Sequence, residues 1–290
     1  MTNAGPAKPD LKALSKASSD HKYVHGHALI LSGGAGKSGA ARLAARGALR
    51  IGAGLVTIAC PQSALAEIAA QTTAIMCRAL DGAPGLAEVL EDQRLNALCL
   101  GPGLGLGPDT QQLVLGALKA KRATVLDADA LTRFKRAPEV LFEATHENTV
   151  LTPHAGEFAR LFPDISEALK ASITNNAANS KVDATREAAK RAGCTILLKG
   201  PDTVIADSDG RASIHSSKGD RSAPWLATAG SGDVLAGFIT GLLARGFSPH
   251  DAAATGTWLH TECALAFGAG LIAEDLPEML PRVFKSLDVF

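Results

Sequence analysis

A glycine-rich segment near the C-terminal end of the chain has the residue types of a catalytic anion site. Ala229-Gly230-Ser231-Gly232-Asp233 runs directly into an apolar helical pattern. Backbone N–H groups at the start of a helix have no intrahelical partner and bind anions such as phosphate. The Asp233 carboxylate would repel a phosphate, so we interpret it as a base that takes a proton from a hydroxyl aimed at that phosphate. An aspartate here also suits helix capping and the helix dipole, and this alternative stays open.

Composition and charge exclude several classes of protein. A chain of 290 residues can bury a large core, and we expect one α/β domain. Lys plus Arg and Asp plus Glu each number 29, which disfavours nucleic acid or an anionic membrane as a partner. Five scattered cysteines without a C-x-x-C pair indicate a reduced, cytoplasmic protein with neither a disulfide framework nor a zinc site. Residues 1–20 are polar and lack a signal or membrane segment, so we predict a flexible arm there and a single domain over 21–290.

Short apolar runs alternate with helical patterns along the chain. This alternation predicts an α/β fold with a mostly parallel central sheet and helices on both faces. The predicted strands are His27–Leu31, Leu55–Ala59, Ala97–Leu100, Thr124–Leu126, Thr149–Leu151 and Thr195–Leu198. The predicted helices include Gly39–Ile51, Gln111–Lys121, Ala155–Phe162 and Ser180–Ala192. Thr203–Ala206 and Ala212–His215, joined by Asp207-Ser208-Asp209-Gly210, predict a hairpin that forms an antiparallel edge.

Glycines and polar residues gather where the predicted strands end. In open α/β sheets, ligands bind outside the carboxyl ends of the strands, so these groups predict one long cleft. They are Ser32-Gly33-Gly34, Gly101-Pro102-Gly103-Leu104-Gly105, Asp127-Ala128-Asp129, Thr152-Pro153-His154 and Lys199-Gly200.

The two commonest nucleotide-binding motifs are absent from the chain. A P-loop would need glycine where Leu31 stands, and G-x-G-x-x-G fails at Pro108. The Ser32–Ser38 segment either brings backbone close to a ligand or forms an ordinary turn. Gly101–Gly107 contains four glycines, more than a simple turn requires, and this favours a ligand-binding wall.

Charged residues at the strand ends allow more than one interpretation. Asp127 and Asp129 suit a Mg²⁺ ion bound mainly through waters, or hydroxyl recognition, and Asp129 also suits a helix cap. His154 either contacts a ligand or caps and packs at the start of the next helix. Lys199 either contacts a phosphate or is solvated.

Taken together, the motifs resemble the NAD(P)H-hydrate dehydratase family, which has the ribokinase-like fold. They occur in the family's order over about residues 20–285, and six motifs in order are specific. The resemblance implies a ribokinase-like three-layer sandwich. The motifs are the Gly34–Val56 string, Gly-Pro-Gly-Leu-Gly, Leu-Asp-Ala-Asp-Ala-Leu, Thr-Pro-His-Ala-Gly-Glu, Leu-Leu-Lys-Gly-Pro-Asp-Thr and Leu-Ala-Thr-Ala-Gly-Ser-Gly-Asp-Val-Leu-Ala-Gly.

The resemblance also implies an activity and a set of site residues. The family is a group of carbon–oxygen lyases that restore NADH or NADPH from the S-epimer of NADHX or NADPHX, with ADP or ATP as co-substrate and Mg²⁺ at its phosphates. Its contacts with the hydrated cofactor fall on Ala40, Gly105, His154 and Asp233, with Asp233 as the catalytic base. Its contacts with the nucleotide fall on Lys199, Gly200, Pro201, Asp202, Thr203 and Gly232. The amides of Gly230, Ser231 and Gly232 form the anion hole, and no residue is predicted to bind a metal directly.

A small-molecule kinase of the same fold, acting on hydroxyethylthiazole or a sugar, is the alternative function. It would share Asp233 but release a phosphorylated product. The resemblance further implies a homo-oligomer, often a tetramer. Many bacterial relatives carry an N-terminal epimerase domain, for which a 20-residue arm is too short. We therefore expect either that a separate protein supplies this step or that the chain acts only on the S-epimer.

Overall fold

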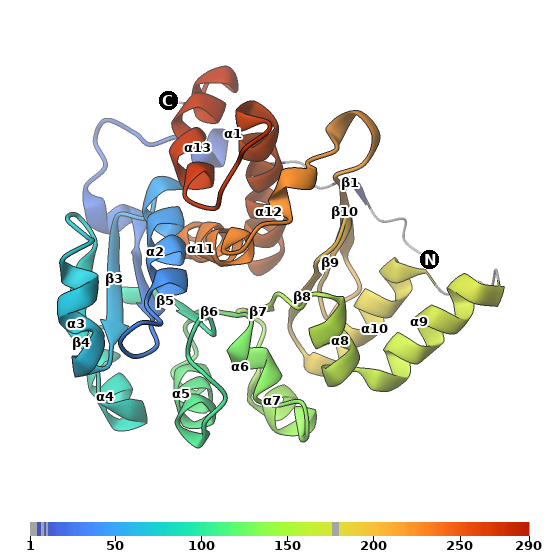
Figure 1. Ribbon diagram of the computed structural model, residues 1–290, viewed down its shortest axis with the longest axis horizontal. Coiled ribbons are helices and arrows are strands. Elements are labelled where there is room, and N and C mark those ends of the chain that lie inside the picture. Colours follow the sequence, from blue (N-terminus) through green and yellow to red (C-terminus); the bar gives the residue numbers. More distant parts are fainter. Residues whose placement is uncertain (1–4, 7–8, 10, 176–179, 290) are drawn as a thin grey trace.

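One twisted sheet forms the centre of the molecule. The computed structural model describes residues 5–6, 9, 11–175 and 180–289. Within these residues, ten strands form a sheet in the order β1-β10-β9-β8-β7-β6-β5-β2-β3-β4 (Figure 1). The strands are β1 Gly5–Pro6, β2 His27–Leu31, β3 Leu55–Cys60, β4 Met76–Ala79, β5 Leu95–Leu100, β6 Ala123–Leu126, β7 Thr149–Leu151, β8 Thr195–Leu198, β9 Asp202–Ala206 and β10 Ala212–Ser216.

Helices cover both faces of the sheet (Figure 1). They are α1 Leu11–Leu14, α2 Gly39–Arg50, α3 Gln62–Ala69, α4 Gly82–Val89, α5 Pro108–Lys119, α6 Asp129–Thr132, α7 Pro138–Ala144, α8 Ala155–Leu161, α9 Pro163–Asn175, α10 Lys181–Ala192, α11 Ser231–Ala244, α12 Pro249–Phe267 and α13 Asp275–Ser286. Ala28 and Ile30 of β2 pack in a core with α2, α11, α12 and α13. Leu29 and Leu31 pack in a second core with α4, α5, α8 and α10. Successive side chains of a strand point to opposite faces, so the predicted three-layer α/β sandwich is confirmed.

Strand directions agree with the prediction over most of the sheet. Strands β2 to β8 pair in parallel, and β9 is antiparallel to both β8 and β10, as the predicted hairpin requires. Two strands were not predicted. β1 pairs in parallel with β10, outside the antiparallel hairpin. β4 pairs with β3 at the opposite edge, and its Met76 is 41% exposed, so this strand lacks the apolar run of a buried one.

Part of the predicted N-terminal arm contacts the domain. Leu14 is 2% exposed and belongs to the core. The Arg245 guanidinium donates hydrogen bonds to the carbonyl oxygens of Ala13 and Leu14 at 3.0 and 2.7 Å. The division of the chain at residue 20 stays a prediction, and residues 1–4, 7–8 and 10 lie outside the described part. No helix in the described ranges has both the length and the apolar character needed to cross a bilayer.

Close packing of α2 against α11 brings two helix N-termini to the same edge of the sheet. A Cβ atom at Gly237 would lie 2.1 Å from the Ala44 carbonyl oxygen, so only glycine permits this approach. Residue numbers increase together along the contact between the two helices: Gly230 at the start of α11 lies beside Leu43 of α2, and Gly241 lies beside Ile51. The two helices are therefore roughly parallel, and both begin near the carboxyl ends of the central strands.

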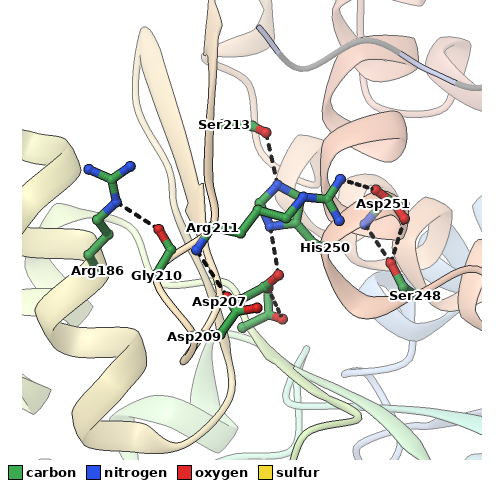
Figure 2. Close-up of polar contacts among 10 residues, drawn as sticks. Arg186, Asp207, Asp209, Gly210, Arg211, Ser213, Ser248, His250 and Asp251 are labelled. Atoms are coloured by element: carbon green, nitrogen blue, oxygen red, sulfur yellow. Dashed lines mark hydrogen bonds and ion pairs between the residues drawn. The ribbon is translucent and has the colours of Figure 1, made fainter. Parts of the chain in front are cut away.

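Polar contacts hold the tip of the β9–β10 hairpin against two helices (Figure 2). From α12, the His250 Nδ1 atom lies 3.1 Å from Asp207 Oδ2, and its Nε2 atom lies 2.8 Å from Ser213 Oγ. From α10, Arg186 Nε donates to the Gly210 carbonyl oxygen at 2.9 Å. We call Asp207, Ser213 and His250 the hairpin network. This network fixes the tip of the hairpin, which is the end away from the cleft.

Candidate active site

The predicted strand-end groups form one continuous wall. A Cβ atom at Gly33 would lie 2.0 Å from the Gly103 carbonyl oxygen, so the turn after β2 and the loop after β5 are in backbone contact. The Lys199 N–H donates to the Pro153 carbonyl oxygen at 2.9 Å, joining the ends of β7 and β8. Lys199 Nζ lies 2.7 Å from Asp127 Oδ1, which joins β8 to β6. Segments far apart in sequence thus meet along the edge where the prediction placed a cleft.

A cavity of about 630 Å³ opens at this edge, between the hairpin side of the sheet and the start of α11. Most of the predicted nucleotide contacts line it, namely Lys199, Gly200, Pro201, Thr203 and Gly232, together with Ser231 and His154. The other predicted site residues, Ala40, Gly105, Asp202, Gly230 and Asp233, lie outside this lining. The structure therefore groups the nucleotide set and places most of the predicted cofactor contacts beyond it.

Asp233 is the third residue of α11 and does not cap it. The N-cap is Gly230, which is left-handed with a φ of 87°, and no side chain caps the helix. The pKa of the Asp233 carboxyl is raised to about 6, chiefly by burial and then by the neighbouring Asp127 carboxylate, while Lys199 opposes the rise. A carboxyl group with this pKa is mostly ionised at neutral pH and still basic enough to accept a proton.

Asp127, Lys199 and Asp233 form what we call the acid–lysine cluster. The Asp127 side chain is only 3% exposed and the Lys199 side chain 22%, so Lys199 is paired rather than solvated. Burial lowers the pKa of Lys199, but Asp127 and the other nearby carboxylates outweigh it and the net shift is upward. A Cβ atom at Gly232 would lie 3.6 Å from Lys199 Nζ. The ammonium group thus stands beside the first turn of α11, where an anion would bind.

Asp129 holds the glycine-rich loop instead of capping a helix. The N-cap of α6 is Ala128, and it receives no side-chain hydrogen bond. Asp129 Oδ2 accepts from the Gly105 N–H at 2.8 Å, and Thr110 Oγ1 donates to the Gly105 carbonyl oxygen at 2.8 Å. The helix-cap interpretation of Asp129 was wrong because the loop after β5 folds over the start of α6. Gly105 is consequently fixed at the edge of the cleft.

His154 caps the next helix, as one of the two interpretations predicted, while its contact with a ligand stays a prediction. Its Nδ1 atom accepts from the N–H groups of Gly156 and Glu157 at 2.9 and 3.3 Å. The Glu157 carboxylate accepts from the His154 N–H at 2.9 Å, which completes a capping box at the start of α8. The same imidazole ring lines the cavity. Burial raises the pKa of Glu157, and the Asp127 charge adds to this effect.

His260 is a site residue that the sequence did not indicate. It lies on α12, is 6% exposed and lines the cavity. Its Nε2 atom lies 2.9 Å from the Ser231 carbonyl oxygen, and its ring meets the Phe238 ring edge to face. Burial lowers the pKa of His260 to about 4, so the neutral ring donates its N–H to Ser231 and fixes the start of α11. No sequence motif around His260 predicts this role, because its partner Ser231 is 29 positions away in the chain.

Two further lysines hold the loop between β8 and β9. Lys181 Nζ donates to the Asp202 carbonyl oxygen at 2.5 Å and to that of Lys199 at 3.3 Å, and burial lowers the pKa of Lys181 to about 8. The Asp202 carboxylate pairs with Lys218 Nζ at 2.5 Å and accepts from Ser216 Oγ at 2.7 Å. Asp202 is thus already paired at the rim of the cavity, while Lys218 lines it.

Comparisons with known proteins show the family of the chain. A family profile described as NAD(P)H-hydrate dehydratase matches residues 28–282. A bifunctional NAD(P)H-hydrate repair enzyme of Moorella thermoacetica is 38% identical over 290 residues, covering 94% of this chain and 52% of the relative. The chain spans about half the length of the curated relatives it matches.

Solved structures confirm the predicted ribokinase-like fold. The ADP/ATP-dependent NAD(P)H-hydrate dehydratase of Bacillus subtilis, co-crystallised with ATP and Mg²⁺, matches with a TM-score of 0.77 at 28% identity, covering 99% of both chains. A ribokinase-like superfamily protein of Enterococcus faecalis V583 matches with a TM-score of 0.78 at 25% identity, covering 95% of this chain and 93% of that chain.

Proposed function

The chain belongs to the NAD(P)H-hydrate dehydratase family, and on this premise we propose that it dehydrates the S-epimer of NADHX or NADPHX with ADP or ATP as co-substrate. The observation that carries the proposal is the position of Asp233. A half-buried carboxyl whose pKa is raised to about 6 stands in the first turn of α11, next to the Gly232 amide and to Lys199. A site for binding alone would not need this acid beside an anion site.

Each group has a defined part in the proposed reaction. Hydroxide is a poor leaving group, so the hydroxyl of the hydrate is first converted into a phosphate ester. Asp233 accepts the hydroxyl proton as the oxygen attacks the terminal phosphorus of the nucleotide, and AMP or ADP leaves. The amide of Gly232 and the Lys199 ammonium stabilise the charge on the transferring phosphoryl group. The lone pair of the ring nitrogen then expels phosphate, and loss of a proton from the adjacent ring carbon restores the double bond.

Mg²⁺ fits this site only when it is bound to the phosphates of the nucleotide. Among the described residues, no group of three or more His, Cys, Asp or Glu side chains is placed to hold a metal ion. Asp127 is already paired with Lys199, and Asp129 accepts from Gly105. Mg²⁺ would therefore be held mainly by phosphate oxygens and waters, where it neutralises phosphate charge. We also propose a reducing, cytoplasmic setting, which the five free cysteines support, and a homo-oligomeric assembly.

The test uses the purified protein with NADHX and either ADP or ATP. We expect recovery of the reduced-nicotinamide absorbance band together with release of one phosphate per NADH formed, and the faster nucleotide identifies the preferred co-substrate. Nucleotide consumption with a stable phosphorylated product and no recovery of absorbance would replace the dehydratase with a kinase. No reaction with either nucleotide would contradict the proposal.

A further inference from the structure

The loop that joins β8 to β9 forms one wall of the cavity of about 630 Å³, and protein groups hold its carbonyl oxygens. The Gly200 carbonyl oxygen accepts from Thr203 Oγ1 at 2.9 Å. The carbonyl oxygens of Lys199 and Asp202, on either side of the loop, both accept from Lys181 Nζ, at 3.3 and 2.5 Å. A single ammonium group therefore bridges the two ends of the loop.

Lys181 stands where an ammonium group does not stabilise its own helix. It is the first residue of α10, after the N-cap Ser180, and a positive charge at a helix N-terminus opposes the helix dipole. Burial lowers the pKa of Lys181 to about 8, because the charged form loses hydration there. Its Nζ atom would lie 2.9 Å from a Cβ atom at Gly200, so the ammonium group lies against the loop backbone. The contacts of Lys181 thus stabilise the loop rather than α10.

The contact with Lys181 sets the direction of the peptide group between Lys199 and Gly200. In a trans peptide, the C=O and N–H groups point in opposite directions. The Lys199 carbonyl points toward Lys181, so the Gly200 N–H points away from it. Gly200 lines the cavity whereas Lys181 does not, so this N–H is directed to the cavity side of the loop. Within the residues that the structure describes, the Gly200 N–H donates to no protein acceptor, and a ligand in the cavity can use it.

We propose that Lys181 is a positioning residue for the nucleotide, which holds the Lys199–Gly200 peptide so that the Gly200 N–H donates to the bound co-substrate. The inference rests on the proposed function and adds to it a residue outside the cavity lining. The Lys199 ammonium group is held separately by Asp127 at 2.7 Å. Rotation of the peptide would therefore withdraw the Gly200 N–H while the acid–lysine cluster keeps its ion pair. Loss of the Lys181 ammonium group should weaken nucleotide binding and leave the chemical step in place.

Kinetics in which the nucleotide and NADHX are varied separately test this role. Lys181→Met keeps the length of the side chain and removes its donors. We expect the KM and Kd for ADP or ATP to rise about tenfold, as for the loss of roughly one hydrogen bond. The kcat at saturating nucleotide and the KM for NADHX should stay within about twofold of wild type. Lys181→Arg retains N–H donors and should restore most of the nucleotide affinity. Lys190→Met removes an exposed ammonium group from the same helix and is the matched control, which should change none of these quantities.

The possible results separate this inference from the proposed function. A nucleotide KM within about twofold of wild type in Lys181→Met, or no recovery in Lys181→Arg, would overturn the inference. A fall in kcat, or an equal rise in the KM for NADHX, would also overturn it, because Lys181 would then act on the reaction site or on the whole fold. If Lys181→Met does not fold, Lys181→Gln is measured instead, since its shorter side chain cannot bridge both carbonyl oxygens. Failure of the wild-type protein to dehydrate NADHX would contradict the proposed function, and isothermal titration of wild type and variant with ADP would still test Lys181.

Discussion

The hairpin network and the acid–lysine cluster contain similar residue types but differ in their surroundings. In the hairpin network, distances of 3.1 and 2.8 Å join Asp207, His250 and Ser213 in the order of a catalytic triad (Figure 2). His250 is 1% exposed, so no substrate can reach it. The acid–lysine cluster stands beside a cavity, and its aspartate has a raised pKa. Suitable residue types and distances are therefore not enough for an active site. A ligand must also be able to reach the residues, and a reactive group must have a shifted pKa.

The two groups also stabilise the fold in different ways. In the hairpin network, His250 Nε2 lies 2.8 Å from Ser213 Oγ, and His250 Nδ1 lies 3.1 Å from Asp207 Oδ2 without a hydrogen bond of regular geometry. These contacts hold the hairpin tip against α12. In the acid–lysine cluster, the Lys199 ammonium pairs with Asp127, and the nearby Asp233 carboxylate adds a second negative charge that this pair does not neutralise. Protonation of Asp233 relieves that charge, which agrees with its raised pKa. The hairpin network is thus sealed inside the protein, whereas the acid–lysine cluster keeps a carboxyl group with a raised pKa beside a cavity.

The largest expected effect is on Asp233. Asp233→Asn removes the proton acceptor, so turnover of NADHX should fall by about 10²- to 10⁴-fold while nucleotide binding is nearly unchanged. Steady-state kinetics and a nucleotide titration measure both quantities. The matched control is Asp207→Asn in the hairpin network, which should keep turnover within about twofold of wild type. A few-fold loss only in Asp233→Asn would remove this residue from the mechanism.

Lys199 should affect both activity and stability. Lys199→Met leaves the buried Asp127 carboxylate without a partner, which destabilises the fold by about 3–5 kcal/mol, and removes the cation beside the phosphoryl group. Denaturant titration should show that adding Asp127→Asn restores much of the stability, while kcat stays low. Recovery of kcat in the double variant would show that the pair acts on the fold alone.

A side chain at Gly232 should weaken the nucleotide site. Gly232→Val places methyl groups toward Lys199 Nζ, which lies 3.6 Å from the Cβ position, and crowds the amides of the first turn. We expect nucleotide affinity to fall about tenfold, the loss of roughly one charge-assisted hydrogen bond. Isothermal titration with ADP and ATP measures this change. Unaltered affinity would contradict the anion-site assignment.

The pH dependence of activity tests the raised pKa of Asp233. Asp233 is active when ionised, so kcat/KM should fall about tenfold per pH unit below its pKa of about 6. Asp127→Asn removes a neighbouring negative charge, which lowers the pKa of Asp233, and the midpoint should move to lower pH. An unchanged midpoint in this variant would show that burial alone sets the pKa.

The smallest effect on catalysis is expected from the hairpin network. His250→Ala leaves Asp207 and Ser213 without their partner, and the free energy of unfolding should fall by about 1–3 kcal/mol. At a temperature where the variant is folded, kcat should equal that of wild type. A large loss of kcat would mean that the hairpin network reaches the cleft and would remove the contrast between the two groups.

Local patterns predicted the fold well where each strand is a continuous apolar run. His27–Leu31, Thr149–Leu151 and Thr195–Leu198 are predicted with their observed bounds. Strand β4 was missed because Met76 is 41% exposed and the segment is apolar over too few residues. The short β1 was missed because two residues carry no periodicity. Edge strands depend on their neighbour for pairing, and that information is not local.

The sequence by itself determined the α/β class, the edge of the sheet that carries the site, and the acid at the start of α11. These follow from apolar periodicity and from residues at most a few positions apart. Only the tertiary structure decided that Lys199 pairs with Asp127, 72 positions away, and that His260 fixes Ser231. It also decided that the serine, histidine and aspartate of the hairpin network are buried, and that the acid–lysine cluster lies beside a cavity. Burial and charge proximity set acidity, and both arise from contacts between distant segments of the chain.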